Sequence, residues 1–279
     1  MKNIKNDFNE YGFCIVRNLI SEKEHKDIFF LFYDVSISII YRYNIKTKFS
    51  LKPLNKLKYP EDVQVLDKLI LTILKKDKKL IGELYDTISY SSAFLKFFSG
   101  DKFVKITKNL LGLEKYNSIY SWTHRVRIDP PFDNRRTYGW HQEVFYTIPN
   151  TRFLQTWCPI IRNTSIRNGT IEICPRSHSK GIAKQKWNEI SGRATQILID
   201  KKEVNKFTQK SIPMKIGDVM FFDPHLFHRS GNNTTASQVR FSLVGMWNDT
   251  NFKNFKPPKP NFISRTISPK ENFKNHFKN

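Results

Sequence analysis

The sequence predicts a mainly β protein with a helical cover, and three observations support this prediction. Residues 118–250 are a series of short β-branched or aromatic runs, such as RFSLVGMWN, separated by Gly, Pro, Asn and Asp. Many short strands in series are typical of a sandwich, a jelly roll or a barrel. Residues 1–117 are helix-rich instead, with helical spacing of apolar residues in stretches such as DVQVLDKLILTILKK. The 279 residues suffice for a well-buried core.

The N-terminal part reads in order as a helix end, a strand and a long helix. In FNEYGFCIVRNLI, at residues 8–20, a glycine separates the end of a short helix from an apolar strand. Ser21 and Glu24 form the capping-box pattern that begins the next helix. Its apolar run at residues 28–41 is interrupted by Asp34 and is too short to cross a bilayer. We therefore expect a buried amphipathic helix there and no membrane span.

We expect residues 1–250 to form a single domain, in which 118–250 are the β-barrel core and 1–117 the helix-rich part. Residues 251–279 form a Lys- and Pro-rich extension that we expect to wrap the surface or to be partly mobile. The chain has three cysteines and no CxxC pair, and its N-terminus, MKNIKNDFNE, has no apolar core. These features predict a reduced cytoplasmic protein without disulfides or a signal peptide.

The formal net charge of +22 raises the question of nucleic-acid binding. The lysines are scattered along the whole chain, and Asn, Ile and Phe are abundant too, as in proteins from AT-rich genomes. We therefore attribute part of the charge to composition and do not predict specific nucleic-acid binding. The charge remains compatible with an anionic substrate.

A histidine and a carboxylate lie two residues apart in GWHQEVF, which has a β-prone, aromatic setting. On a strand, His141 and Glu143 would share one face, and Gln142 would point to the other. Such a triplet alone is more often part of a half-buried strand than of a metal site. A third ligand elsewhere in the chain is needed to favour the metal.

Residues 217–242 supply two candidates for the third ligand, His225 and His228. The stretch GDVMFFDPHLFHRSGNNTTASQVRFS reads as a buried strand, two histidines, a polar turn and a strand that carries Arg240. An arginine in an apolar strand either forms a structural salt bridge or binds the carboxylate of a ligand. Two histidines and one carboxylate on one face of a metal form the facial triad of non-haem Fe(II) oxygenases, which leaves positions for a 2-oxo acid and O2.

Four stretches of this chain resemble the phytanoyl-CoA dioxygenase family of Fe(II)- and 2-oxoglutarate-dependent oxygenases. They are FNEYGFCIVRNLISEKEH, WHQE, NGTIEICPRSHSKG and GDVMFFDPHLFHRSGNN followed by Arg240. The resemblance implies a double-stranded β-helix, which is a jelly-roll or cupin-like barrel, covered by N-terminal helices. It also implies His141, Glu143 and His228 as the catalytic iron ligands. Arg240 and Ser230 match the residues that hold the carboxylate of 2-oxoglutarate.

Two positions depart from the family pattern. Glu143 stands where aspartate is usual, so either the metal lies further from the strand or the strand is displaced. Arg176 stands where glycine is usual. His225 competes with His228 for the metal, and the family spacing with the HxSG pattern favours His228. Relatives that halogenate lack the carboxylate ligand, so its presence favours hydroxylation.

Four arginines are candidates for substrate contacts. Arg125 and Arg127 share one face of a strand, and Arg135 and Arg136 lie in the loop before the WHQE stretch. Their functional role would be the recognition of a carboxylate, phosphate or sulfate group. The alternative is ordinary solvated surface charge.

We therefore expect an Fe(II)- and 2-oxoglutarate-dependent dioxygenase that uses O2 to hydroxylate a small molecule, with an anionic substrate as one possibility, and releases succinate and CO2. Tyr138 and Trp157 are candidate neighbours of 2-oxoglutarate or substrate, with core packing as the alternative. The rival function is a non-catalytic jelly-roll module for an anionic glycan or nucleic acid. A nucleic-acid oxygenase would need an aromatic base pocket and a basic groove, and no such motif is visible. The sequence predicts neither the substrate nor the oligomeric state.

Overall fold

The computed structural model describes residues 2–146, 151–191 and 195–256. The α-helices are α1 (Lys2–Tyr11), α2 (Glu22–Arg42), α3 (Val63–Lys76), α4 (Leu80–Ser89), α5 (Ser92–Phe98), α6 (Asp101–Leu111) and α7 (Lys201–Val204). The strands are β1 (Phe13–Val16), β2 (Ile119–Asp129), β3 (Phe153–Pro159), β4 (Ile171–Cys174), β5 (Gln185–Asn188), β6 (Gln196–Ile199), β7 (Lys210–Ser211), β8 (Val219–Phe222), β9 (Phe227–Ser230) and β10 (Arg240–Asp249). Short 3-10 turns are η1 (Leu54–Lys56), η2 (Asn134–Arg136), η3 (Glu143–Phe145) and η4 (Ser177–Lys180).

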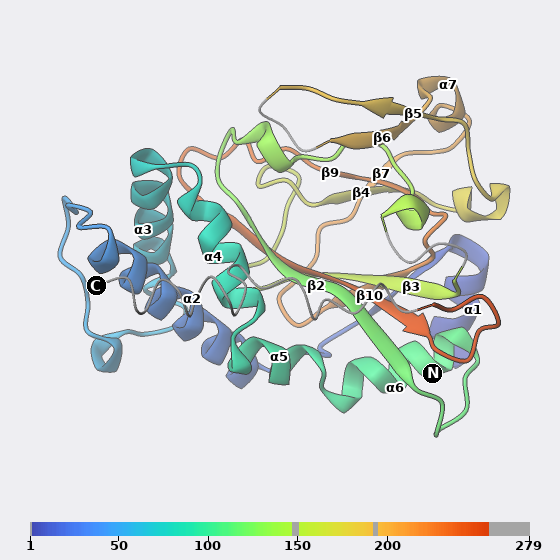
Figure 1. Ribbon diagram of the computed structural model, residues 1–279, viewed down its shortest axis with the longest axis horizontal. Coiled ribbons are helices and arrows are strands. Elements are labelled where there is room, and N and C mark those ends of the chain that lie inside the picture. Colours follow the sequence, from blue (N-terminus) through green and yellow to red (C-terminus); the bar gives the residue numbers. More distant parts are fainter. Residues whose placement is uncertain (1, 147–150, 192–194, 257–279) are drawn as a thin grey trace, which may run out of the picture.

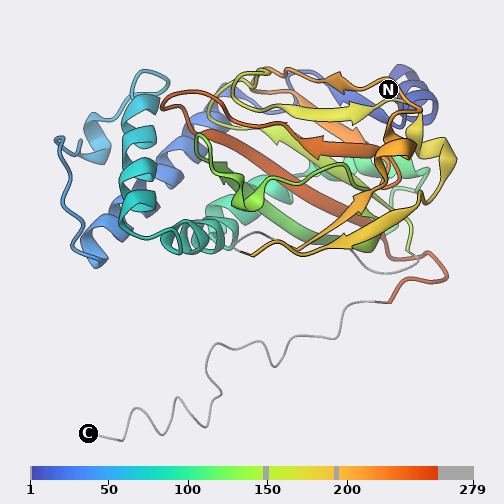
Figure 2. The ribbon, with the colours of Figure 1, turned by 90° about the horizontal axis from the view of Figure 1, so that it is seen from above.

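The strands form a double-stranded β-helix, as the sequence predicted. A large antiparallel sheet has the order β1-β8-β3-β10-β2, a smaller one has the order β7-β4-β9, and β5 pairs with β6. Figures 1 and 2 show α2 to α6 along one face of the large sheet, with β4, β7 and β9 on its other face. The space between the two sheets is the inside of the barrel.

The helices bury the outer face of the large sheet because β10 alternates apolar side chains toward them. Phe241 of β10 meets Phe32 of α2 with ring centroids 5.4 Å apart, and Trp247 stacks on Phe98 of α5 at 4.6 Å. Gly245 permits this close approach, because a Cβ at that position would lie 2.0 Å from the Phe98 ring. The intervening residues of β10 point into the barrel, where Arg240 begins the strand.

The N-terminal elements agree with the sequence prediction. The Ser21 side chain accepts a hydrogen bond from the backbone of Glu24, whose carboxylate accepts one from the backbone of Ser21. Gly12, at φ +81°, separates α1 from β1. None of the helices in the described ranges is long and apolar enough to cross a membrane. The expected extension at 251–279 lies outside the described residues beyond position 256.

Two features of the β region differ from the prediction. The pair β5 and β6 and the short strand β9 were not expected, because each has only four residues and carries polar side chains. The WHQE stretch is not a strand: His141 makes one isolated bridge, and Glu143 already lies in the turn η3. The prediction that His141 and Glu143 share a strand face was therefore wrong in its geometry.

A buried histidine on α2 makes the stability of the fold depend on pH. His25 is 2% exposed, and neither ring nitrogen has a hydrogen-bond partner within the described residues. Burial disfavours the imidazolium and lowers the pKa of His25 to about 4. Between pH 6.5 and 4 the unfolded chain therefore binds a proton that the folded chain excludes, so the free energy of unfolding falls as the pH falls.

We expect His25→Phe to remove this pH dependence. From pH 7 to pH 5 the wild-type protein should lose about 2 kcal/mol of unfolding free energy through His25 alone. Urea unfolding of both proteins at both pH values measures the difference. Equal losses in the two proteins would contradict the assignment to His25.

Candidate active site

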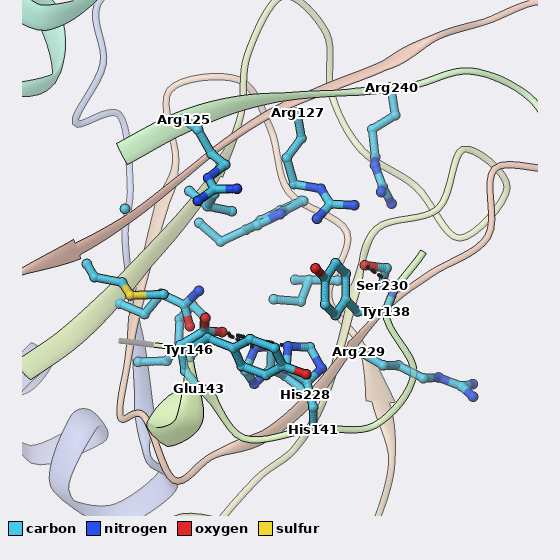
Figure 3. A pocket seen from close by; sticks show the side chains of 17 residues that line it. Arg125, Arg127, Tyr138, His141, Glu143, Tyr146, His228, Arg229, Ser230 and Arg240 are labelled. Atoms are coloured by element: carbon cyan, nitrogen blue, oxygen red, sulfur yellow. Dashed lines mark hydrogen bonds and ion pairs between the residues drawn. The ribbon is translucent and has the colours of Figure 1, made fainter. Parts of the chain in front are cut away.

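A cavity of about 190 Å³ lies between the two sheets and is lined by side chains from both. Its lining includes His141, Glu143 and His228, which we call the triad. Figure 3 shows the triad on one wall and Arg125, Arg127 and Arg240 extending toward it from the opposite wall. The arginines come from β2 and β10 of the large sheet.

The backbone brings the two triad histidines together. His141 and His228 exchange backbone hydrogen bonds of 3.0 and 3.1 Å, which form the isolated bridge. Each imidazole Nδ1–H donates to a nearby carbonyl: His141 to Gly139 at 2.7 Å and His228 to Leu226 at 2.9 Å. Because a carbonyl only accepts, these bonds fix both tautomers and leave each Nε2 free to bind a metal.

Glu143 completes the triad from the turn η3. Its backbone N–H donates to the carbonyl of Pro224 at 2.9 Å, which fixes the turn to the segment before β9. Its Oε2 lies 3.7 Å from Nε2 of His141 and 3.4 Å from Nε2 of His228. One ligand atom from each of the three residues lies within 4.8 Å of the others, and all three residues are buried. Two imidazoles and one carboxylate in this arrangement fit an iron ion with open coordination positions.

The electrostatics of the site favour an ionised Glu143 and a neutral His228. Burial would raise the pKa of Glu143, but the two adjacent imidazoles outweigh it and hold that pKa well below its usual range. Burial and the neighbouring His141 lower the pKa of His228. An ionised carboxylate and neutral imidazoles are the forms that bind a metal.

Gln142, between two triad residues, anchors the ligand segment and was not recognised from the sequence. It points away from the cavity, as expected, but is fully buried rather than solvated. Its amide nitrogen donates to the carbonyls of Gly181 and His225, and its oxygen accepts from the Ala183 backbone and the Gln185 side chain. These four bonds position the loop that carries His141 and Glu143.

Arg240 faces the cavity beside a buried carboxylate that the sequence reasoning also missed. The register of β10 and β2 places Arg240 opposite Asp129, and its Nη2 lies 2.8 Å from Oδ2 of Asp129. Arg127 donates to the other oxygen of Asp129 at 3.0 Å. Burial would raise the pKa of Asp129, but the two guanidinium groups lower it to about 2. The sequence did carry a signal for this cluster, because Arg125, Arg127 and Asp129 alternate along one strand and therefore share a face.

Two glycines lie next to the Arg240 guanidinium and allow the chain to pack closely around it. Arg240 Nη1 donates to the carbonyl of Gly231 at 3.1 Å. A Cβ on Gly169, at φ +84°, would lie 2.9 Å from that same nitrogen, and a Cβ on Gly231 would lie 2.3 Å from the carbonyl oxygen of Thr170. Gly169 of the NGT motif therefore leaves space for the buried guanidinium, and Gly231 of the HRSG motif allows the two backbone segments to approach each other.

The aromatic and hydroxyl candidates all line the cavity. Ser230, Tyr138 and Trp157 belong to its lining, and the Ser230 backbone donates to the Tyr138 carbonyl at 2.9 Å. Figure 3 places Ser230 and Tyr138 together on the side nearer Arg240. Tyr146 of the η3 segment also lines the cavity and was not predicted.

The four candidate arginines divide into two groups. Arg125 and Arg127 line the cavity, as expected for residues that share a strand face. Arg135 and Arg136 do not: Arg135 pairs with Asp133 at 2.5 Å, and Arg136 lies over the ring of Tyr85 at 4.2 Å. Both arginines lie in η2, which directs their side chains toward α4 and not toward the triad.

The structure distinguishes the two histidines that competed for the third position. His228 lies in β9 within the triad, whereas Nδ1 of His225 lies 3.0 Å from Oδ1 of Asp223. His225 is not part of the cavity lining. The fold and this site thus define an Fe(II)- and 2-oxoglutarate-dependent oxygenase.

Comparison with known families gives the same class. The chain belongs to the phytanoyl-CoA dioxygenase (PhyH) family, whose model matches residues 8–242. That range contains the triad, Ser230 and Arg240.

Several solved structures share the fold. The epimerase SnoN, solved with Fe3+, alpha ketoglutarate and nogalamycin RO, is 11% identical with a TM-score of 0.60, over 96% of this chain and 93% of that one. EctD from S. alaskensis with bound Fe is 15% identical with a TM-score of 0.58, over 93% and 82%. EvdO2 from Micromonospora carbonacea var. aurantiaca, complexed with 2-oxoglutarate, is 16% identical with a TM-score of 0.55, over 93% and 95%.

Proposed function

We propose that this dioxygenase hydroxylates a small anionic molecule. The observation that best supports an anionic substrate is that three arginines face the triad across the cavity. Asp129 and a cosubstrate carboxylate account for Arg127 and Arg240 but not for Arg125. Arg125 forms no ion pair within the described part of the chain and is exposed. The Glu143 carboxylate supports hydroxylation, because it would take the third ligand position beside the two histidines.

Each residue has a separate task in this proposal. The triad would hold Fe(II), while Arg240 and Ser230 would hold the distal carboxylate of 2-oxoglutarate. Asp129 keeps the Arg240 guanidinium oriented, and Trp157 forms part of the cavity wall. Bound iron, 2-oxoglutarate and O2 together supply an oxidant strong enough for an unactivated C–H bond. The protein then selects the bond by placing the substrate against the triad.

The proposal is tested by a screen of paired small molecules. Succinate release with Fe(II), 2-oxoglutarate and O2 is measured for carboxylates, phosphates and sulfates, each beside its neutral amide or alcohol. We expect turnover to require the anionic partner and the product to gain one oxygen atom from labelled O2. Turnover of the neutral partners at equal rates would contradict an anionic substrate, and a product without added oxygen would contradict hydroxylation.

The length of Glu143 is a testable feature of the metal site. Glu143→Asp retracts the carboxylate by about 1.5 Å, the length of one C–C bond, from a turn whose backbone is held by the Pro224 carbonyl. We expect about tenfold weaker Fe(II) affinity. Glu143→Gln keeps the length but removes the charge, and so separates the two effects in the same Fe(II) titration. Unchanged affinity in Glu143→Asp would show that the turn adapts.

We further propose a single functional unit over residues 1–250 that acts in the cytoplasm. The α4 helix of the N-terminal part packs on β2 beside the cavity, which supports one unit. Cys14, Cys158 and Cys174 are all free and buried, and burial raises the pKa of each thiol. Unpaired cysteines are typical of a reducing compartment.

A further inference from the structure

A second hollow, of about 670 Å³, adjoins the cavity on the side of α4. Its walls are α4, β2 and the η2 segment, and we call it the outer hollow. Arg125, Arg127 and Tyr138 line both the cavity and the outer hollow, so the two spaces meet at these residues. The cavity alone is smaller than the 300–1,000 Å³ or so that is usual for ligand pockets. A substrate that shares it with a cosubstrate must extend outward.

Two arginines without an acidic partner in the described residues line the outer hollow. Within the described residues, every arginine pairs with an acidic side chain except Arg125, Arg136 and Arg167. Arg125 and Arg136 both line the outer hollow, whereas Arg167 lines neither space. Two guanidinium groups that form no ion pair within the described residues and line one concave site are suited to bind an anion from outside the chain.

Local structure holds these two arginines in place. Arg136 lies over the ring of Tyr85, whose hydroxyl is itself fixed by hydrogen bonds of 3.0 Å to the Ile128 backbone. A Cβ on Gly82 would lie 3.3 Å from Nη2 of Arg136, so the glycine in the first turn of α4 leaves room for the guanidinium. A stacked guanidinium loses less freedom when it binds a ligand.

An irregularity in β2 directs Arg125 to the junction. The pairing with β10 runs from Val244 opposite Arg125 to Met246 opposite Trp122, so two residues of β2 face Gly245. Such a bulge re-aims the side chains beside it and is frequent next to active sites. As a result, both His124 and Arg125 contribute to the outer hollow although they are neighbours in sequence.

Other groups in the hollow do not neutralise the two arginines. Asp86 of α4 also lines it, is exposed, and forms no ion pair within the described residues. The remaining lining is mostly hydroxyl or aromatic: it includes Ser89, Tyr90, Tyr120 and Ser121. The hollow is therefore a polar space in which Arg125 lies where it meets the cavity and Arg136 lies on the η2 wall.

We propose that Arg125 and Arg136 together bind the anionic group of the substrate, a phosphate, sulfate or carboxylate, in the outer hollow. The rest of the substrate passes Tyr138 and Arg127 into the cavity, which brings its reactive carbon to the triad. This assignment rests on the proposed function and deepens it, since it divides the arginines by task. Arg240 binds the cosubstrate, and Arg127 forms part of the wall shared by the cavity and the outer hollow. Arg125 and Arg136 bind the substrate.

The test uses the full chain with Fe(II) and saturating 2-oxoglutarate, without oxygen. Phenylglyoxal modifies accessible arginines, and peptide mass spectrometry gives the rate at each residue. Sulfate and acetate are added as probes against chloride of equal ionic strength. We expect sulfate or acetate to slow the modification of Arg125 and Arg136 and to leave Arg167 unchanged. Protection by sulfate indicates a phosphate- or sulfate-bearing substrate, and protection by acetate alone indicates a carboxylate.

Variants test whether one anion is shared by both arginines. In Arg125→Gln, the anion concentration that half-protects Arg136 should rise about tenfold, because a charge-assisted hydrogen bond is lost. Arg136→Gln should do the same at Arg125, and Arg167→Gln should change neither value. The absence of protection, or protection of each arginine independent of the other, would overturn the inference. The visible band of the Fe(II)–2-oxoglutarate complex, recorded on the same samples, reports separately on the proposed function.

Discussion

His228→Ala is expected to abolish oxygenase activity and to weaken Fe(II) binding by more than about 100-fold, since even groups that only orient metal ligands contribute 10–100-fold. The substitution removes one of the two Nε2 atoms that face Oε2 of Glu143. It keeps the backbone bridge to His141, which uses main-chain atoms alone. Anaerobic Fe(II) titration of the purified variant measures the affinity, and circular dichroism verifies that it is folded.

His225→Ala is the matched control for this prediction. His225 lies three residues earlier and outside the cavity lining, with its ring paired to Asp223. We expect it to keep Fe(II) affinity within a few-fold of wild type. If His225→Ala lost iron and His228→Ala retained it, the triad would be assigned to the wrong histidine.

Asp129→Ala is expected to reduce the unfolding free energy by about 3–5 kcal/mol, the usual effect of leaving a buried charge without its partner. Asp129 lies between Arg127 and Arg240, and all three side chains are largely buried. Because its pKa is about 2, Asp129 is ionised at neutral pH and compensates both guanidinium groups. We also expect weaker 2-oxoglutarate affinity, because Arg240 loses the contact that orients it. Urea unfolding and 2-oxoglutarate titration measure the two effects.

Asp133→Ala provides the comparison for Asp129→Ala. Asp133 pairs with Arg135 in the η2 segment, outside the cavity lining. Its removal should cost at most about 1 kcal/mol, as is usual for partly exposed ion pairs. Similar losses in both variants would show that the Asp129 cluster has no special role in the fold.

The class of site was predictable from the sequence because its parts lie in short, spaced motifs. His228 in β9 of the smaller sheet and Arg240 at the start of β10 of the large sheet flank one polar turn, and both line the cavity between the sheets. The N-terminal helices were predictable for the same local reason, since the Ser21 capping box and the apolar periodicity depend only on near neighbours.

The geometry of the ligand segment was not predictable, because it depends on distant contacts. Glu143 occupies a 3-10 turn that is fixed by the Pro224 carbonyl, and Gln142 is buried by a loop some forty residues away. Local strand propensity around WHQE is overridden by these bonds. Likewise, nothing local distinguishes Arg135, which pairs within its own turn, from Arg136, which stacks on α4.

The central claim is that the triad binds Fe(II) with 2-oxoglutarate anchored by Arg240. The most direct test adds both to the apo-protein without oxygen and records the visible charge-transfer band of the chelate. We predict a band in wild type that is absent in His141→Ala and needs more 2-oxoglutarate in Arg240→Ala. No band in folded wild-type protein with excess iron would contradict the account and favour a non-catalytic binding module.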